Sequence, residues 1–237
     1  MTGASPEELA RLLAKVEMFG ALSEKELLWL ARRVPEMSLG RGQILFGPTQ
    51  ESRSIFVMID GRLRLYKMLG GAEITLEIVK PGHLFGDVPA LAGRRRDTYA
   101  ETLDPSRVAI LSISLLHHLV QVNPEVGLRL AERLAGRLYE SREWIADIAL
   151  KKVSARLASF LVRLLETEGM VDREGVGIRT RYTHEQFAAM IGARRVAVSR
   201  AMGELRSLGA IEVKGRRVYL RDEDALRRTA EITATEV

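Results

Sequence analysis

The chain of 237 residues contains no cysteine, and its 20 glycines and 7 prolines are too few for a low-complexity chain. Without cysteine it cannot form disulfides, thiolate zinc sites, cysteine nucleophiles or cysteine-held iron–sulfur clusters. The first residues lack the basic character of a signal peptide, and no apolar run approaches the roughly 18 residues of a membrane span. We therefore expect a cytoplasmic protein of one large or two ordinary domains, with no membrane partner.

What the chain does contain is a basic C-terminal third. Residues 1–150 carry 19 basic and 19 acidic side chains, whereas residues 151–228 carry 17 basic and 10 acidic ones. A neutral part joined to a basic part is typical of a protein of which one end meets a polyanion, most often nucleic acid. An arginine-rich surface that only keeps the protein soluble would give the same count. The choice between this alternative and nucleic-acid binding therefore depends on the sequence motifs.

The first half of the chain predicts two short helices followed by a strand-rich region. Residues 5–17 form an amphipathic pattern, and Ser23 with Glu26 makes a capping box before a second helix over Leu27–Val34. From Gly40 to Ile113 apolar and polar residues alternate between regularly spaced turns, as in half-buried strands of an antiparallel sandwich or barrel. The alternating apolar positions include Ile55, Val57, Ile59, Leu63, Leu65, Ile74, Leu76 and Ile78.

Asn123-Pro124-Glu125 starts a long helix, because proline is tolerated where its missing N–H has no partner to lose. Along this helix an apolar seam repeats every seven residues, which predicts a partner helix. A second copy of the same helix is the simplest partner, and burial against the chain's own strands is the alternative. The seam consists of Leu134, Leu138, Ser141, Ile145 and Ile148.

The last third predicts a helix-turn-helix. Residues 151–168 read as a helix and Gly169–Gly177 as a loop. Thr183 and Gln186 then form a second capping box, and the helix that they begin is broken at Gly192. A further helix over Arg194–Leu208 follows at once, with Val198, Met202 and Leu205 facing inward, and a hairpin with the basic tip 214–217 comes after it.

If those three apolar residues face inward, the opposite side of the helix faces out and suits DNA. Arginine can donate two hydrogen bonds to the edge of guanine, and valine can contact a thymine methyl group. We predict base reading by Arg195, Val196, Ser199 and Arg200. We predict phosphate contacts, which fix register without reading sequence, by Thr183, His184, Arg194, Arg216 and Arg217.

From about Phe19 to Asp222 the chain resembles the Crp/Fnr family of bacterial transcription regulators. The segments that carry the resemblance are Ile55–Gly61, Pro81–Asp87, the Asn-Pro-Glu helix start, Thr183–Ala188, Ile191-Gly192 and Val198-Ser199-Arg200. The resemblance implies an α+β fold with an N-terminal cyclic-nucleotide-binding-type β jelly roll, a long dimerisation helix and a C-terminal winged helix-turn-helix. The corresponding parts are residues 1–122, 123–150 and 151–228, followed by a tail over 229–237.

The resemblance also implies a function. It implies a homodimer that binds two-fold symmetric double-stranded DNA, with an effector in the jelly roll and with RNA polymerase as a partner if the protein activates transcription. Arg195, Ser199 and Arg200 match contact positions of the family. Val196 stands where the family often has a glutamate that accepts from cytosine, so we expect a half-site that differs at that base pair.

The effector pocket departs from the cyclic-AMP pattern. The family's cassette places a glutamate on the ribose and an arginine followed by a hydroxyl residue on the phosphate. Here the matching pocket residues are Gly86, Asp87, Arg96 and Asp97, with Arg95 beside them, and a carboxylate at position 97 repels phosphate. Asp97 instead pairs with a neighbouring arginine, or those arginines offset its charge.

No specific effector follows from these residues. A different small molecule or nucleotide stays open, and cyclic AMP is doubtful. Ser141 matches a ligand-touching hydroxyl of the family or is a polar residue that sets the register of the seam. His83, His117 and His118 are the only histidines that a haem could use in this half, and we expect none of them, nor any other residue, to bind a metal.

Two other classes of function compete with a DNA-binding regulator. One is an enzyme tethered to DNA, against which stands the lack of a nucleophile with its base or of a phosphate loop. The other is a cyclic-nucleotide-binding regulatory subunit, which has no use for a basic helix-turn-helix. We therefore predict a regulator without enzymatic activity.

Overall fold

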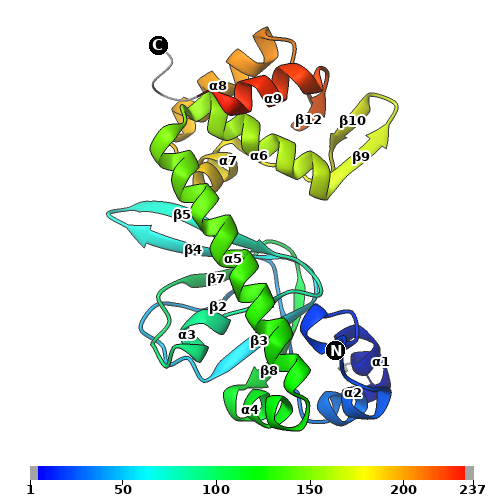
Figure 1. The fold of residues 1–237 in the computed structure, drawn as a ribbon. Coiled ribbons are helices and arrows are strands. Elements are labelled where there is room, and N and C mark those ends of the chain that lie inside the picture. The colour runs from blue at the N-terminus through cyan, green and yellow to red at the C-terminus, as the bar shows by residue number, and fades with distance from the viewer. Residues whose placement is uncertain (1–4, 233–237) are drawn as a thin grey trace. The chain divides into compact units, whose positions relative to one another are not determined.

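A computed structural model describes residues 5–232, which form two compact units divided along the chain between Leu138 and Tyr139. The first unit opens with two helices, continues with eight strands and ends in helices (Figure 1). Its elements are α1 (Pro6–Leu13), the 3-10 helix η1 (Glu17–Phe19), α2 (Glu24–Ala31), β1 (Glu36–Leu39), β2 (Ile44–Phe46), β3 (Ser54–Asp60), β4 (Leu63–Leu69), β5 (Ala72–Val79), β6 (Leu84–Phe85), α3 (Asp87–Leu91), β7 (Tyr99–Thr102), β8 (Ser106–Ser112), α4 (Ile113–Val122) and the first half of the long α5 (Pro124–Leu150), whose second half belongs to the second unit.

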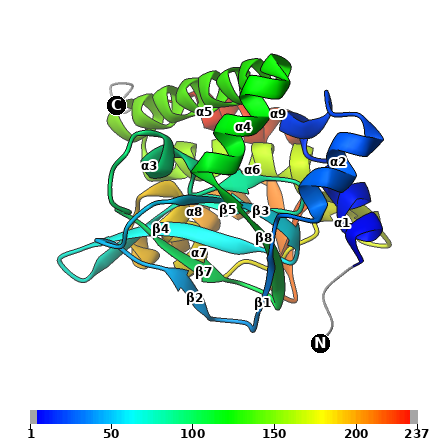
Figure 2. The same ribbon diagram turned by 90° about the horizontal axis from the view of Figure 1, so that it is seen from below.

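The strands of the first unit form two antiparallel sheets with the orders β1-β8-β3-β6 and β2-β7-β4-β5. One apolar core fills the space between these sheets, with Phe46, Phe56 and Phe85 among its residues. A second core lies on the other face of the β1-β8-β3-β6 sheet, where α1, α2, α4 and the start of α5 cover it (Figure 2). The predicted β sandwich is therefore backed by a layer of helices.

Two details of the strand prediction are wrong. β3 is buried on both faces, with Ile55 and Val57 toward the helices and Phe56 and Met58 toward the other sheet, so it is not half-buried. In β5 the pattern is interrupted, because the register shifts between Leu65 and Tyr66 on the neighbouring β4. As a result Thr75 is buried and Leu76 is exposed.

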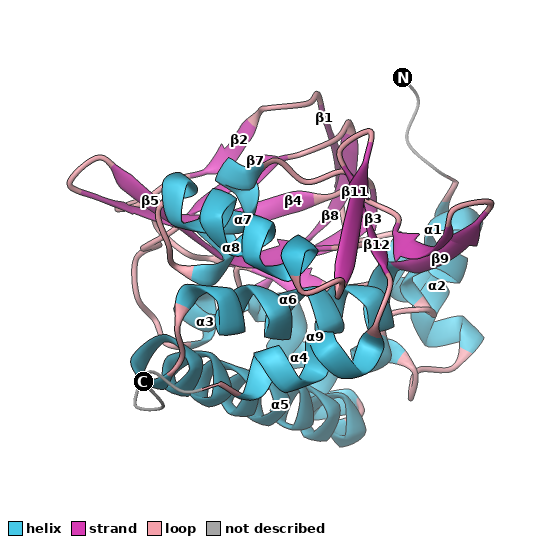
Figure 3. Cartoon of the chain, turned by 90° about the horizontal axis from the view of Figure 1, so that it is seen from above, coloured by secondary structure: helices cyan, strands magenta, loops and turns pink. Residues whose placement is uncertain are grey.

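The second unit combines packed helices with one further sheet. α6 (Val153–Glu168) lies against α7 (His184–Ile191), α8 (Arg195–Ser207) and α9 (Glu223–Glu231). The strands β9 (Gly169–Asp172), β10 (Gly175–Ile178), β11 (Ile211–Lys214) and β12 (Arg217–Leu220) form a sheet with the order β11-β12-β10-β9. The β11–β12 hairpin follows α8 and packs against it (Figure 3).

The segment Gly169–Gly177, predicted to be a loop, is instead most of the β9–β10 hairpin. The glycines of this segment are typical of a loop, so the sequence pattern did not indicate strands. The hairpin is extended into a sheet by β12, where Tyr219 pairs with Gly177 of β10, some forty residues earlier in the chain. A side chain at Gly177 would lie 2.7 Å from the Tyr219 ring, so this close approach requires glycine. The sequence pattern also missed α3, α4 and α9, and the last five residues of the predicted tail, 233–237, lie outside the described part of the chain.

Candidate DNA interface and effector pocket

The helix-turn-helix forms as local sequence rules require. The Thr183 hydroxyl accepts from the backbone N–H of Gln186, and the Gln186 side chain accepts from the Thr183 N–H, which completes the predicted capping box. Gly192 ends α7 in the left-handed region (φ 62°), a conformation that glycine adopts without strain. α8 then begins three residues later with Arg194 as its N-cap.

The predicted inward and outward faces of α8 are both present. Val198, Met202 and Leu205 are buried, while Arg195, Val196, Ser199 and Arg200 are exposed. Among residues 5–232, no carboxylate lies within ion-pair distance of Arg194, Arg195 or Arg200. These arginines therefore keep their charge available for a polyanion.

One hydrogen bond links the two helices of this motif. The Nδ1 atom of His184, the first residue of α7, lies 2.8 Å from the Oγ atom of Ser199 on α8. The same Ser199 hydroxyl donates to the Arg195 carbonyl oxygen at 3.1 Å. Two residues predicted to contact DNA separately are thus joined within the protein.

Beside α8 the surface is hollowed. A pocket of about 330 Å³ is lined by the apolar side chains of Phe187, Met202 and Val218 and by the polar residues His184, Glu185, Arg195 and Arg216. Arg195 comes from α8 and Arg216 from the tip of the β11–β12 hairpin, which we call the wing. Cations from two elements therefore flank one depression.

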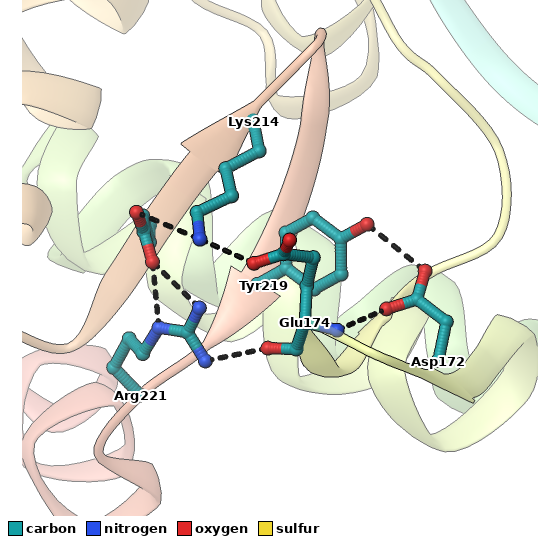
Figure 4. A network of polar contacts seen from close by, with 6 residues as sticks. Asp172, Glu174, Lys214, Tyr219 and Arg221 are labelled. Atoms are coloured by element: carbon teal, nitrogen blue, oxygen red, sulfur yellow. Dashed lines mark hydrogen bonds and ion pairs between the residues drawn. The ribbon is translucent and has the colours of Figure 1, made fainter.

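Most charges of the wing are already paired with acidic residues. Arg217 donates to the Asp172 carboxylate at 3.2 Å. The Tyr219 hydroxyl donates to the same carboxylate at 3.0 Å, and Lys214 pairs with Glu174 (Figure 4). The Glu174 N–H donates to Asp172, and this bond, with those from Tyr219 and Arg217, lowers the pKa of the Asp172 carboxyl. These contacts brace the wing against the β9–β10 hairpin.

A further ion pair continues this network at the base of the wing. Arg221 binds Glu212 through two hydrogen bonds of 2.8 and 2.6 Å and also donates to the Glu174 carbonyl oxygen. Arg217, predicted to contact phosphate, is thus already held by a carboxylate. Arg216 is exposed at the tip, and no carboxylate of the described residues lies within ion-pair distance of it.

Two exposed arginines were not among the predicted phosphate contacts. Arg179 and Arg181 lie in the segment that leads into α7, just before Thr183. No carboxylate among residues 5–232 lies within ion-pair distance of either one. Their position next to a capped helix start was the available signal, because such starts attract phosphate.

In the first unit, the predicted phosphate-binding arginine is buried. Arg96 is 5% exposed and donates to the carbonyl oxygens of Gly86 and Ser54 at 3.2 and 2.8 Å. Its guanidinium lies over the rings of Phe46 and Phe56, 3.9 and 5.1 Å from their centres. Burial lowers the pKa of Arg96 to about 10, and no carboxylate of the described chain offsets that loss of hydration.

The predicted ribose-binding carboxylate is engaged as well. Asp87 is 1% exposed and accepts two hydrogen bonds from Arg137 of α5, at 2.9 and 3.1 Å. Arg137 also binds Glu77 on β5 at 2.6 Å. One arginine therefore ties α5 to the start of α3 and to the sheet, a link that sequence spacing did not indicate.

Asp97 pairs with Lys67 at 2.7 Å and not with one of the neighbouring arginines, so that alternative is wrong. Arg95 is exposed and donates to the Thr49 carbonyl oxygen at 2.9 Å. The cause is the sheet, since Lys67 lies on β4 beside the strand that Asp97 precedes. The polar groups of Asp87, Arg96 and Asp97 thus all have partners within the protein.

The seam of α5 is largely uncovered. Leu134 packs against the helix-side core of the first unit, so for this residue the alternative of burial in its own chain applies. Leu138 and Ile145 are 55% and 61% exposed, and Ile148 and Ser141 are exposed too. An apolar stripe of this kind on a long helix is unusual on a monomer and typical of an interface.

Comparison with known proteins identifies both units. A family model described as a cyclic nucleotide-binding domain matches residues 36–123, and one described as a Crp-like helix-turn-helix domain matches residues 155–229. The transcriptional regulator LdrP of Thermus thermophilus is 30% identical over 191 residues, which are 80% of this chain and 94% of that protein. The chain belongs to the Crp/Fnr family.

Other Crp/Fnr proteins align over nearly the whole chain. A CRP-like cAMP-activated global transcriptional regulator of Mycobacterium tuberculosis is 24% identical over 92% of this chain and 98% of its own. The crystal structure of a CRP/FNR-family transcriptional regulator from Thermus thermophilus has 27% identity and a TM-score of 0.69, and the match covers 84% of this chain and 99% of that one. The predicted family and fold are therefore confirmed.

As a Crp/Fnr protein, the chain is a DNA-binding transcription regulator with an effector-type domain at its N-terminal side. Its relatives are transcription regulators, a class that is not enzymatic, which gives no support to the DNA-tethered enzyme. Among residues 5–232 there is no helix with both the length and the apolar character that crossing a bilayer requires. No group of three or more histidine or acidic side chains in the same residues is placed to hold a metal ion.

Proposed function

We propose that this Crp/Fnr regulator acts as a homodimer that reads two-fold symmetric DNA with one α8 from each copy. The observation that carries the proposal is the exposed face of α8, where Arg195 and Arg200 have no acidic partner in the described chain. Helices of this motif enter the major groove through their N-terminal residues. In such a dimer we expect the two half-sites to lie about one turn of DNA apart, as is usual for this motif.

Within this proposal the side chains divide into two classes. Arg195, Arg200 and Val196 meet base edges, and valine in place of an acceptor removes selection for cytosine at one position. Phosphate contacts come from His184, Arg194 and Arg216, from Arg179 and Arg181, and from the Thr183 hydroxyl as a donor. Arg217 contributes least, because Asp172 already neutralises it.

Dimerisation is proposed through the seam of α5. Leu138, Ile145 and Ile148 are exposed in one chain, and a second α5 in parallel would bury them against their own counterparts. Ser141 lies between them and would meet its own copy, which favours a single register. Its other predicted role, contact with a ligand, stays a prediction.

For the effector, we propose that the pocket does not respond to cyclic AMP. Arg96 is buried against phenylalanines, Asp87 is bound by Arg137, and Asp97 places a carboxylate beside the phosphate position. A nucleotide would have to displace all these contacts before binding. The protein acts in the cytoplasm, with RNA polymerase as its further partner where it activates.

Selection of bound duplexes from a random-sequence library tests the proposal. The expected result is an inverted repeat whose half-sites are centred about one DNA turn apart. Changing Arg195 to Ala should then relax one base pair in each half-site. Enrichment of single, unpaired half-sites, or no enrichment at all, would overturn the proposal.

A further inference from the structure

The Ser199 hydroxyl has one proton and two hydrogen-bond partners. It donates that proton to the Arg195 carbonyl oxygen, which has no proton to give. The bond to His184 must then run the other way, with Nδ1–H donating to the Ser199 oxygen. The hydrogen-bond network thereby assigns the tautomer of His184.

This tautomer decides what His184 can do at a phosphate. In a neutral imidazole with its proton on Nδ1, the Nε2 atom carries only a lone pair. A phosphate oxygen is an acceptor as well, so the two atoms repel each other. While the Ser199 hydroxyl donates to the Arg195 carbonyl oxygen, Nε2 can donate to phosphate only after the ring takes up a second proton and becomes an imidazolium.

The charges around His184 link the uptake of this second proton to the arrival of DNA. Arg195 from α8 and Arg216 from the wing line the same hollow as His184, with Glu185 as the acidic residue and Tyr182 as the other titratable one. An arriving phosphate reverses this balance, because its negative charge favours the imidazolium.

We propose that Ser199 is a positioning residue that fixes His184 as a proton-dependent phosphate contact, so that DNA binding takes up protons. This inference rests on the proposed function, since it requires that α7 and α8 meet a duplex. It changes the predicted role of Ser199 from base reading to control of a neighbour. It also gives the regulator an affinity for DNA that rises as the pH falls.

Titration calorimetry in two buffers with different ionisation enthalpies tests the inference directly. The full-length protein is titrated onto the selected duplex and onto a random duplex at several pH values. We expect uptake of up to about one proton per chain, and an affinity that changes by at most about tenfold per pH unit for each proton taken up. The uptake should be the same on both duplexes, because phosphate contacts do not read sequence.

Variants distinguish between the two roles considered for Ser199, which are base reading and the positioning of His184. S199A should abolish most of the proton uptake, because a released neutral ring can move its proton to Nε2 and donate to phosphate without becoming charged. Its affinity for both duplexes should therefore lose most of its pH dependence to the same extent. S199T keeps the hydroxyl and should restore the uptake. H184R should bind both duplexes without uptake at any pH. H117Q changes an exposed histidine on α4 of the other unit, so it is the matched histidine control and should behave as the wild type.

The outcomes are distinct. Unchanged uptake in H184R, or an S199A variant that keeps its uptake and loses affinity only for the selected duplex, would overturn the role of Ser199 and leave the proposed function intact. A wild-type protein that does not prefer the selected duplex would instead contradict the proposed function itself.

Discussion

The guanidinium of Arg96 lies 3.9 Å from the centre of the Phe46 ring, in an environment without a counter-charge among the described residues. In this position it fills the sandwich core instead of facing an open pocket. The residue that the resemblance assigns to a ligand phosphate is therefore packed within this domain, with its donors directed to the Gly86 and Ser54 carbonyl oxygens.

Millimolar cyclic AMP should leave the melting temperature of the protein unchanged. Binding to the native state alone would stabilise it by about 2.7 kcal/mol at a hundredfold excess over Kd, which a domain of this size shows as a rise of several degrees. Differential scanning fluorimetry with and without the nucleotide measures this. Such a rise would refute the closed pocket.

Arg137 and Arg129 occupy the same helix but should differ in their effect on stability. Arg137→Met strands the buried Asp87 carboxylate and should lower the free energy of unfolding by about 3 kcal/mol. Arg129→Met removes a half-exposed pair with Glu125 and a long hydrogen bond to the Glu17 carbonyl oxygen, and should lower it by about 1 kcal/mol. Urea unfolding monitored by circular dichroism compares them.

A second substitution checks the cause of the larger loss. Asp87→Asn in the Arg137→Met background replaces the stranded charge by a neutral amide and should recover most of the stability. No recovery would mean that Arg137 acts through its packing alone.

Arg195→Ala should weaken binding to the selected duplex by about 1–3 kcal/mol and relax one base pair. Arg216→Ala, at the wing tip, should weaken specific and random duplexes alike and reduce the salt dependence by about one phosphate contact. Fluorescence anisotropy at several salt concentrations distinguishes these patterns. Equal losses on both duplexes for Arg195→Ala would place that residue on the phosphates.

Stability below neutral pH should depend on His83. Its pKa is lowered by burial, then by the cations of Arg133 and Lys80. Because the unfolded chain binds the proton more readily, stability is fully present above the ordinary value of 6.5 and is lost as the pH falls toward the lower folded pKa. His83→Gln should flatten this part of the stability curve in urea titrations; an identical curve would contradict the shift.

Ile145→Asp should dissociate the proposed dimer. Each copy would bury one charge in an apolar seam, which costs about 3 kcal/mol or more, equivalent to at least about a hundredfold in Kd. Val171→Asp is the matched control, since Val171 is 80% exposed on β9 and lies outside the seam. Sedimentation velocity measures both, and a dimeric Ile145→Asp variant would exclude the seam as the interface.

The sequence was sufficient for the helix starts, the helix break and the buried face of α8, which depend on neighbours in the chain. It was not sufficient for α4 and α9, although their N-caps Ser112 and Asp222 are also local signals. The capping boxes at Ser23 and Thr183, the break at Gly192 and the inward face of α8 all formed as predicted, because each involves residues within one or two helical turns. The exposed arginines of α8 follow directly from that inward face.

Long-range packing accounts for what the sequence missed in the sheets and in the effector pocket. The β9–β10 hairpin depends on Tyr219, and the bulge at Leu65 moves Thr75 inward through pairing across a sheet. Asp87 and Arg137 are fifty residues apart, and their contact exists only because α5 packs on the sandwich. No local pattern encodes these relations, and Arg96 gave no sign of burial because arginine is ordinarily exposed.

Native mass spectrometry of the protein bound to its selected duplex measures the central claim most directly. The account predicts two chains per duplex, bound to an inverted repeat, with Ile145→Asp reducing the complex to one chain. A single wild-type chain on each duplex, bound to a site without two-fold symmetry, would contradict it.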